Sequence, residues 1–380
     1  MPKADILIVD DTPTNLSLLT KMLTGNGYAV RAVTNGLRAL ESVQALPPDL
    51  ILLDIRMPGL TGFQVCEQLK ADMQTHEIPV IFISALDDIQ DKIRGFNAGG
   101  VDYITKPFQL EEVLARTETH LNMRRLQRQL QEANRKMAAE LRLAGQMQAN
   151  FMPSRLPNPP GWNLTAHLQP ARETSGDFFD AFNLPDGRLV VLIADVVDKG
   201  VGAALFMAYV WSIIRTYADE YPSDPPLVFN LVNRRILTDT GTNQFVTLFY
   251  GVIDPASGKM VYSNAGHLPP LHFCIGQKSQ PDRLLRTGMP LGIYDDQEWQ
   301  KHSINLARGD LLVLYTDGIT DAVDAQEKNF GEKRLAAAVK NDLNKPLRTI
   351  QEKIFSAVEE FTRDVQQFDD MALVLVSRSK

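Results

Sequence analysis

Acidic, hydroxyl and basic side chains stand where predicted strands of the N-terminal third end. Asp10 and Asp11 close the first apolar run, Asp54 the third and Ser84 the fourth, and Lys106 follows the fifth. Because the carboxyl ends of parallel strands share one edge of an open sheet, these side chains should meet in one crevice. Three carboxylates packed together repel and need a cation, which Mg²⁺ supplies with oxygen ligands. A carboxylate beside a metal and a lysine is suited to attack a phosphoryl group.

A second set of acids lies at predicted strand ends in the C-terminal half: Asp177, Asp195, Asp317 and the pair Asp369-Asp370. Buried together without matching arginines, these carboxylates would be costly unless divalent ions neutralised them. A ligand set of oxygen atoms alone selects Mg²⁺ or Mn²⁺ over zinc. Two such ions about 4 Å apart can hold a bridging hydroxide for in-line attack on a phosphate monoester, without a protein nucleophile.

Each residue also has a purely structural interpretation. Asp11 could cap a helix, Asp54 could be a loop residue, Lys106 could be a surface charge, and aspartates are common in turns such as Asp186-Gly187. One residue alone would favour that interpretation. Whole sets of such residues at matching strand ends favour metal binding and phosphoryl chemistry.

The elements that must position the first set alternate at βαβ spacing. Thr12-Pro13 marks a helix start after the first strand. The pattern predicts a doubly wound, five-stranded parallel sheet with helices on both faces. The predicted strands are Ile6–Val9, Ala29–Val33, Leu50–Leu53, Val80–Ile83 and Val101–Ile104.

Residues 110 to 151 contain no proline and one glycine, Gly145, which predicts one long helix. Apolar or small residues step by three and four along it, from Met123 through Leu130 and Met137 to Phe151. The helix either lies on its own domain or forms a parallel coiled coil that pairs two chains. The polar flanks favour the coiled coil, with a stutter at Glu140.

Prolines 153, 157, 159 and 160 end that helix, and a new domain begins. The turn Asp254-Pro255-Ala256-Ser257-Gly258 joins two of its strands as a hairpin, so an α+β layered sandwich flanked by helices is expected. The predicted domains are 1–122, a helical linker 123–152, and 153–380. The predicted elements of the last domain are strands Leu189–Ala194, Phe245–Ile253, Lys259–Asn264, Asp310–Thr316 and Ala372–Val376, and helices Ala203–Asp219, Pro226–Leu237 and Leu347–Val365.

Composition narrows the class of protein. With 380 residues, 44% of them hydrophobic and 22% charged, the chain is a multi-domain globular protein. A net charge of −7 argues against a nucleic-acid-binding surface. Cys66 and Cys274 are too few for a disulfide framework or a thiolate zinc site, which favours a reducing cytoplasm. Apolar runs fall short of the roughly 20 residues of a membrane span, so no membrane partner is expected.

Residues 5 to about 122 resemble a two-component response-regulator receiver domain. The resemblance rests on four strings: Ile8-Val9-Asp10-Asp11, Leu53-Asp54-Ile55-Arg56-Met57-Pro58-Gly59, Ile83-Ser84-Ala85 and Asp102-Tyr103-Ile104-Thr105-Lys106-Pro107-Phe108. It implies a histidine kinase as phosphoryl donor and Mg²⁺ as cofactor. The implied roles are phosphoacceptor for Asp54, Mg²⁺ ligands for Asp10, Asp11, Asp54 and the Arg56 carbonyl, phosphoryl binding for Ser84 and Lys106, and a rotamer switch for Tyr103.

Residues from about 140 to 378 resemble the SpoIIE-type branch of the metal-dependent, protein phosphatase 2C-like serine/threonine phosphatases. The matching strings are Ser175-Gly176-Asp177-Phe178-Phe179-Asp180, Ala194-Asp195-Val196, Lys199-Gly200-Val201, Asn264-Ala265-Gly266-His267-Leu268-Pro269-Pro270, Tyr315-Thr316-Asp317-Gly318-Ile319-Thr320-Asp321-Ala322 and Phe368-Asp369-Asp370-Met371. The resemblance implies two Mn²⁺ or Mg²⁺ ions. Their implied ligands are Asp177, Asp195, Asp317, Asp369, the Val196 carbonyl and, as a neighbour, Asp370.

Three further residues bear on that resemblance. His267 is considered as an acid, although a histidine in a tight turn more often bonds the backbone. Asp198 stands where the family usually has glycine, and Ala372 replaces a usual Thr or Ser. Both departures could slow the enzyme.

Together the two resemblances imply a cytoplasmic response regulator whose output is a phosphoserine or phosphothreonine protein phosphatase. The implied substrate is a phosphorylated anti-sigma-factor antagonist. Phosphorylated Asp54 would act through a homodimeric linker helix. The alternative is a phosphorylation-gated scaffold with an inert phosphatase fold, supported by Asp198 and Ala372. A DNA-binding output is disfavoured, because no helix-turn-helix or basic patch follows the receiver.

Overall fold

The computed structural model describes residues 2–84, 89–241, 243–275, 280–363 and 365–379. The chain divides into two compact units, Met1–Lys136 and Met137–Lys380. This boundary lies inside the segment 123–152 that the sequence predicts as a linker. The three domain limits stay a prediction.

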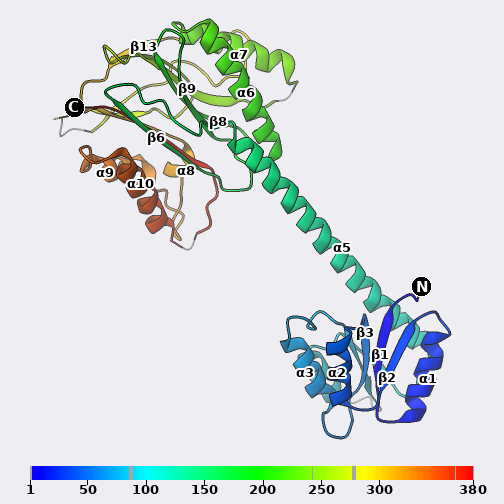
Figure 1. Cartoon of the computed structure of the whole chain (residues 1–380). Helices are drawn as coiled ribbons and strands as arrows, with labels where there is room; N and C mark the ends of the chain where they lie inside the picture. The colour runs from blue at the N-terminus through cyan, green and yellow to red at the C-terminus, as the bar shows by residue number, and fades with distance from the viewer. Residues whose placement is uncertain (1, 85–88, 242, 276–279, 364, 380) are drawn as a thin grey trace. The chain divides into compact units, whose positions relative to one another are not determined.

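The first unit is built on a parallel sheet of five strands in the order β2-β1-β3-β4-β5, so the predicted doubly wound sheet is confirmed (Figure 1). Every predicted strand is present, with ends shifted by one residue at most. Its elements are β1 Asp5–Val9, α1 Pro13–Thr24, β2 Ala29–Val33, α2 Gly36–Ala45, β3 Leu50–Asp54, α3 Gly62–Ala71, β4 Val80–Ser84, α4 Ile89–Asn97, β5 Asp102–Thr105 and the first part of α5 Leu110–Ala149, a helix that continues into the second unit.

Alternate residues of the strands build a core on each face of this sheet. Leu7 and Val9 face the side covered by α2 and α3, whereas Ile6 and Ile8 face α1 and the start of α5 (Figure 1). Helix α1 begins as predicted, with Thr12 as N-cap residue and Pro13 in its first turn. The Thr12 side chain makes no capping hydrogen bond, and its hydroxyl donates to Asp11 Oδ1 at 3.3 Å instead.

The second unit contains two five-stranded sheets, in the orders β13-β10-β9-β8-β7 and β12-β11-β14-β15-β6. The expected layered sandwich flanked by helices is confirmed. Its elements are β6 Trp162–Gln169, β7 Phe178–Asn183, β8 Leu189–Val196, α6 Val201–Glu220, α7 Pro225–Asp239, β9 Val246–Ile253, β10 Lys259–Ala265, β11 Leu271–Phe273, β12 Asp282–Arg283, β13 His302–Asn305, β14 Leu311–Tyr315, α8 Asp317–Thr320, α9 Gly331–Lys340, α10 Leu347–Thr362 and β15 Met371–Arg378.

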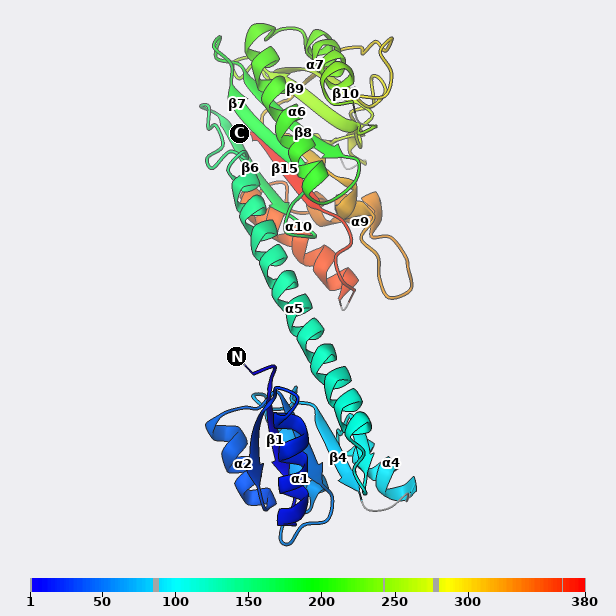
Figure 2. The same cartoon turned by 90° about the vertical axis from the view of Figure 1, so that its right-hand side faces the viewer.

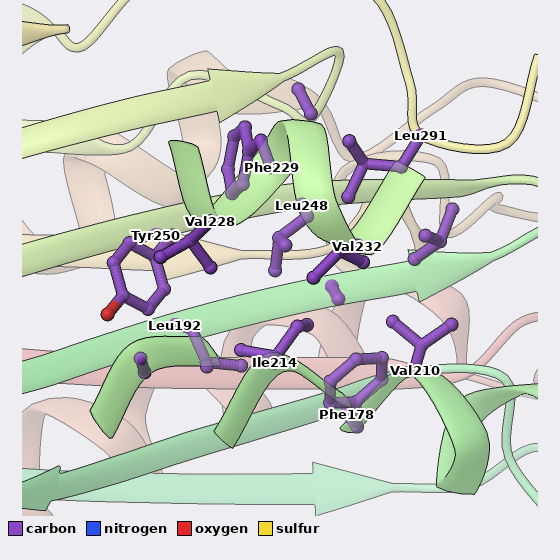
Figure 3. Packing of buried hydrophobic residues seen from close by; sticks show 14 of the residues in the cluster. Phe178, Leu192, Val210, Ile214, Val228, Phe229, Val232, Leu248, Tyr250 and Leu291 are labelled. Atoms are coloured by element: carbon purple, nitrogen blue, oxygen red, sulfur yellow. The ribbon is translucent and has the colours of Figure 1, made fainter. Parts of the chain in front are cut away.

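Three hydrophobic cores hold these layers together. One lies between the sheets and combines residues such as Val191 with Val374. Helices α6 and α7 cover the outer face of the first sheet, where Phe229, Ile214 and Leu248 interdigitate (Figure 3). Helices α9 and α10 cover the outer face of the second sheet (Figure 2). This packing brings the ends of β8 and β14 and the residues before β15 into one region. Lys199, after β8, lies 2.9 Å from Asp369, and Thr316, after β14, accepts a hydrogen bond from the Ala372 N–H at 2.9 Å.

The hairpin between β9 and β10 follows its predicted turn. The two strands pair antiparallel, with Ile253 opposite Met260. Asp254 accepts hydrogen bonds from the Ala256 N–H at 3.0 Å and the Ser257 hydroxyl at 2.5 Å. Gly258 adopts φ 82°, a conformation that favours glycine, so the local sequence closes the turn.

Helix α6 is the one described helix that is long and apolar enough, by its length and composition alone, to cross a membrane. In the structure, 39% of its most apolar stretch is buried. Six of its residues, Phe206 and Val210 among them, are buried in the core on the outer face of the first sheet of this unit.

Candidate functional site

The first candidate site begins with Asp10, which is fully buried at the end of β1. The backbone N–H of Thr12 donates to Asp10 Oδ1 at 2.8 Å. Asn15, one turn into α1, donates from Nδ2 to both Asp10 oxygens at 3.1 and 3.0 Å. Asn15 was not among the residues predicted from sequence, because nothing in its type or spacing signals chemistry. It orients the carboxylate.

The predicted carboxylates of this site come together. One oxygen each from Asp10, Asp11 and Asp54 lies within 4.8 Å of the others, which is a separation that one hard cation could span. Lys106 Nζ lies 2.9 Å from Asp10 Oδ2 and 3.0 Å from Asp54 Oδ2. These oxygen donors and the fixed positive charge fit a Mg²⁺ ion and a phosphoryl group.

Burial and ion pairing shift the pKa values of this site. Burial raises the pKa of Asp54 and the nearby Asp10 adds to the rise, while Lys106 opposes it. For Lys106, burial alone would lower the pKa, but its hydrogen bonds to Asp10 and Asp54 outweigh burial and raise it. The lysine therefore stays charged and compensates carboxylates that would otherwise be costly to ionise.

The remaining predicted residues surround this crevice. Ser84 is 5% exposed at the end of β4. Ala85 lies outside the described residues. The Tyr103 ring packs edge-on against Phe96 with centroids 6.4 Å apart, and Lys92 Nζ lies 4.2 Å from its centroid. The Arg56 backbone N–H donates a hydrogen bond to the Asp54 carboxylate. The Arg56 guanidinium lies 3.6 Å from the Asp91 carboxylate. The roles of Ser84, Tyr103 and the Arg56 carbonyl stay predictions.

The second candidate site contains the buried pair Asp177 and Asp195. Asp177 immediately precedes β7 and is 3% exposed, and Asp195 is the penultimate residue of β8. Burial and the Asp195 charge raise the pKa of Asp177 well above its ordinary value. Burial and the Asp317 charge raise the pKa of Asp195 to about 7. The two carboxyl groups lie close enough for each to perturb the pKa of the other.

Asp177 Oδ2 is buried and has no hydrogen-bond partner among the described residues. An orphaned buried carboxylate oxygen beside a second carboxylate is costly unless a cation neutralises it. This observation and the oxygen-only donor set fit the Mg²⁺ or Mn²⁺ ions implied for this site.

Asp317 and Asp369 lie close enough for their charges to interact. Burial and the Asp369 charge raise the pKa of Asp317, with Asp321 adding a smaller effect. Lys199 Nζ lies 2.9 Å from Asp369 Oδ1. Among the described residues, these acids do not form a group whose ligand atoms all lie within 4.8 Å, as the first site does. Two ions that keep several waters need ligands spread over a wider space.

Asp370 has a different environment from its neighbour. Its Oδ1 accepts from the Ala171 N–H at 2.7 Å, and its Oδ2 accepts from the Ser175 hydroxyl at 2.8 Å and the Gly176 N–H at 2.9 Å. Three donors on one buried carboxylate fix the loop that carries Asp177. The geometry therefore supports a positioning role for Asp370, and metal ligation by it stays a prediction.

The carbonyl of Val196 borders a loop with unusual backbone geometry. A Cβ on Gly176 would lie 3.0 Å from the Val196 oxygen, a tight contact that favours glycine. Asp198 adopts φ 75° and Gly200 φ 87°. The left-handed conformation explains why glycine suits position 198 better than aspartate.

We expect Asp198→Gly to raise the free energy of unfolding by about 1 kcal/mol, because it removes a strained side chain from the left-handed region. Urea unfolding of the protein in the presence of a metal chelator measures the change. Asp198→Ala is the matched control, since it removes the charge but keeps a Cβ. If the alanine variant gains as much stability as the glycine variant, charge and not backbone strain explains the effect.

His267 does not have the environment of an acid catalyst. It is 2% exposed; Nε2 donates to the Tyr315 carbonyl at 3.2 Å, and Nδ1 accepts from the Thr247 hydroxyl at 2.8 Å. Burial lowers its pKa to about 4, so the ring is neutral at physiological pH. His267 instead ties the loop after β10 to the end of β14, as the interpretation of a backbone-bonding histidine in a tight turn predicts.

The C-terminal end of α5 contacts the loop that precedes Asp177. Gln148 is 7% exposed; its Nε2 donates to the Ser175 carbonyl at 2.5 Å, and its Oε1 accepts from the Ser175 N–H at 2.9 Å. Gly145 lies one turn earlier, where an added Cβ would overlap the Glu173 carbonyl oxygen. Helix α5 therefore contacts the acid-bearing loop through the Gln148 side chain and through the close backbone approach at Gly145. Sequence reasoning did not identify Gln148, whose amide gives no catalytic signal.

Comparisons with known proteins agree with this architecture. The family model described as Response regulator receiver domain matches residues 6–118, and that of Stage II sporulation protein E (SpoIIE) matches residues 185–379, just over half of the 380-residue chain. The solved SiaA-PP2C domain of Pseudomonas aeruginosa superposes with a TM-score of 0.58 over 65% of this chain and 99% of that domain. At 19% identity, it establishes the shared fold.

Two curated relatives come from Synechocystis sp. Protein IcfG is 33% identical over 269 residues, which are 63% of this chain and 42% of that protein. The DNA-binding dual master transcriptional regulator RpaA is 45% identical over 121 residues, 32% of this chain and 49% of that protein. The chain thus spans less than half of the length of either relative. With a receiver domain and a protein phosphatase 2C-like fold on one polypeptide, the chain belongs to the SpoIIE family.

Proposed function

We propose that this protein is a response regulator whose phosphorylation at Asp54 controls a metal-dependent phosphoserine or phosphothreonine protein phosphatase. The observation that carries the proposal is the orphaned Asp177 oxygen, buried beside Asp195 on the same chain as the Asp10, Asp11 and Asp54 triad. Each acid set fits phosphorus chemistry, and the family membership supports the phosphatase assignment.

In the receiver, Asp54 would accept the phosphoryl group from a histidine kinase. Asp10, Asp11 and the Arg56 carbonyl would hold Mg²⁺, and Ser84 and Lys106 would bind the phosphoryl oxygens. Lys106 already contacts Asp54 at 3.0 Å, so its charge is placed to compensate the added anion.

In the phosphatase, Asp177, Asp195, Asp317, Asp369 and the Val196 carbonyl would hold two Mn²⁺ or Mg²⁺ ions. When bound, the ions supply an activated water and neutralise the phosphate. Asp370 would keep the Asp177 loop in place, and Lys199 would orient Asp369 through their 2.9 Å ion pair. The family membership supports a phosphorylated anti-sigma-factor antagonist as substrate.

We infer that α5 links the two sites. Its residues 125–137 are all exposed, and the apolar side chains among them include Leu126, Leu130 and Met137, which are 61–64% exposed. An apolar stripe with polar flanks supports pairing with a second copy of the chain as a coiled coil. A change in that pairing would reach the Asp177 loop through Gln148 and Gly145.

Gly145→Ala is expected to lower turnover at subsaturating Mn²⁺ by at least about tenfold, since the new methyl group must displace the Glu173 backbone and with it the acid-bearing loop. Arg142→Ala, an exposed change on the same helix, is the control. Phosphorylation of Asp54 should be unaffected in both variants. Normal Mn²⁺ dependence in Gly145→Ala would contradict the link between α5 and the loop.

The direct test of the proposal is hydrolysis of a phosphoserine peptide by the full chain with Mn²⁺, with and without acetyl phosphate. Metal-dependent hydrolysis that changes on addition of acetyl phosphate is the expected result. Absence of hydrolysis under both conditions would favour the alternative, a phosphorylation-gated scaffold, for which Asp198 and Ala372 were the sequence arguments.

A further inference from the structure

A cavity of about 430 Å³ adjoins the acids of the second candidate site. It lies between α8, α10 and the residues that precede β15. Its volume is within the range of about 300–1,000 Å³ that is usual for ligand pockets. Gly318, the neighbour of Asp317, and Asp369 are among its lining residues, so the cavity is continuous with the acid site.

The walls of the cavity include apolar side chains from three segments. Val323 follows α8, Phe355 and Val358 belong to α10, and Met371 begins β15. Val358 and Met371 are buried in the core that α10 forms with the second sheet of this unit. These walls would accept the apolar part of any side chain, so the charged lining groups must decide which occupant fits.

The charged groups favour a cationic occupant. Besides Asp369, the cavity is lined by two carboxylates, Asp321 and Glu359, and by one guanidinium, that of Arg363. Glu359 is exposed, and its carboxylate makes no hydrogen bond or ion pair with any side chain that the structure describes. A carboxylate that keeps its charge at the edge of an apolar cavity is placed to attract a positive group.

We propose that this cavity binds a lysine or arginine side chain of the phosphoprotein substrate, close in sequence to the phosphorylated residue. The inference rests on the proposed phosphatase function and specifies its substrate class. Lysine and arginine combine an apolar stem with a charged head. The stem would pack against Phe355 and Met371, and the head would lie near Glu359.

The reach of a peptide chain is consistent with this placement. Consecutive residues of an extended peptide lie about 3.3–3.6 Å apart, so the residues within about three positions of the phosphoserine stay near its phosphate. A phosphate bound at Asp317 and Asp369 would therefore leave these neighbours beside the cavity that Asp369 lines.

Hydrolysis of a set of phosphoserine peptides by the full chain with Mn²⁺ tests the proposal. Each peptide has alanine around the phosphoserine except for one lysine, which moves from three residues before it to three residues after it. Lysine at one or two adjacent positions should raise kcat/KM about threefold or more over the all-alanine peptide, which is the size expected for a partly exposed ion pair. Attraction by the net charge of −7 would instead act similarly at every position.

Glu359→Gln should remove the advantage of lysine at those positions. Turnover of p-nitrophenyl phosphate should stay unchanged in this variant, because the small substrate has no side chain to place in the cavity. Glu359→Lys should reverse the preference, so that glutamate at the same position becomes the better residue. Glu360→Gln is the matched control: it removes the same charge from the next residue, which lines a different cavity, and should keep the wild-type preference.

The outcomes separate this inference from the proposed function. If the wild type hydrolyses p-nitrophenyl phosphate but treats all peptides alike, or if Glu359→Gln keeps the lysine preference, the cavity does not bind a basic residue and the phosphatase proposal stands. If the wild type hydrolyses neither p-nitrophenyl phosphate nor any peptide, the proposed function is refuted and this inference with it.

Discussion

Asp317→Asn is expected to reduce Mn²⁺-dependent hydrolysis of a phosphoserine peptide by at least about 100-fold. Replacing the carboxylate with an amide removes one negative charge from the field around Asp195 and Asp369, and with it much of the attraction for a divalent ion. Even the outer supports of metal ligands contribute about 10–100-fold, so loss of a direct ligand should cost more. Initial rates across a Mn²⁺ titration measure the effect.

The control for this variant is Asp186→Asn, a change of the same type in the exposed turn before β8, where Asp186 pairs with Arg188. Circular dichroism and urea unfolding should be close to wild type for both proteins. In the presence of a metal chelator, the loss of the repulsion between Asp317 and its acidic neighbours is expected to stabilise the Asp317→Asn protein. Full activity in Asp317→Asn would refute the metal-ligand assignment, and inactivity of the wild type as well would favour the scaffold alternative.

Asp54→Asn is expected to abolish incorporation of phosphate from acetyl phosphate or from a histidine kinase. An amide is not a nucleophile for phosphoryl transfer, and the variant also weakens the Asp10, Asp11 and Asp54 cation site. Phosphate-affinity electrophoresis of the full chain measures the incorporation. Asp72→Asn, an exposed change at the end of α3, should be phosphorylated like the wild type.

The same variant separates the two halves of the functional proposal. Basal peptide hydrolysis should be retained in Asp54→Asn, whereas the response to acetyl phosphate should disappear. An equal response in wild type and Asp54→Asn would mean that acetyl phosphate acts elsewhere, and the receiver would then not control the phosphatase through this residue.

The parallel sheet of the receiver was predictable because its inner strands β1, β3 and β4 are buried on both faces and form continuous apolar runs. The strands that the sequence did not reveal in the second unit are β6, β7, β11, β12 and β13. Four of these, β6, β7, β12 and β13, are the outer strands of the two sheets, and β11 has only three residues. Strands such as β6 and β13 expose part of their surface and carry polar residues, so no apolar pattern marks them.

Strand β7 was missed for another reason. Its sequence contains Asp180, which is fully buried and held by Arg215 at 2.6 Å and by Trp211 Nε1 at 2.8 Å. A charged residue inside a short apolar run argues against a strand when its partner is unknown. The partner comes from α6, more than thirty residues later, and only the fold brings it near.

The acids of both sites were predictable from their types and positions, since carboxylates at strand ends are costly without a cation. The residues that hold those acids were not. Asn15, Gln148 and Ser175 are ordinary polar residues whose roles depend on a contact with a distant backbone or carboxylate. The neutral His267 shows the converse, because its motif drew attention while its buried ring contacts favour a structural role.

The two hydrogen bonds between the Gln148 side-chain amide and the Ser175 backbone have a reciprocal consequence. If the arrangement of α5 sets how tightly the acid-bearing loop holds its ions, then ion occupancy must bias the arrangement of α5 by an equal free energy. Intracellular manganese would then be an input to the pathway as well as a cofactor, and the output enzyme would report back on its own upstream switch.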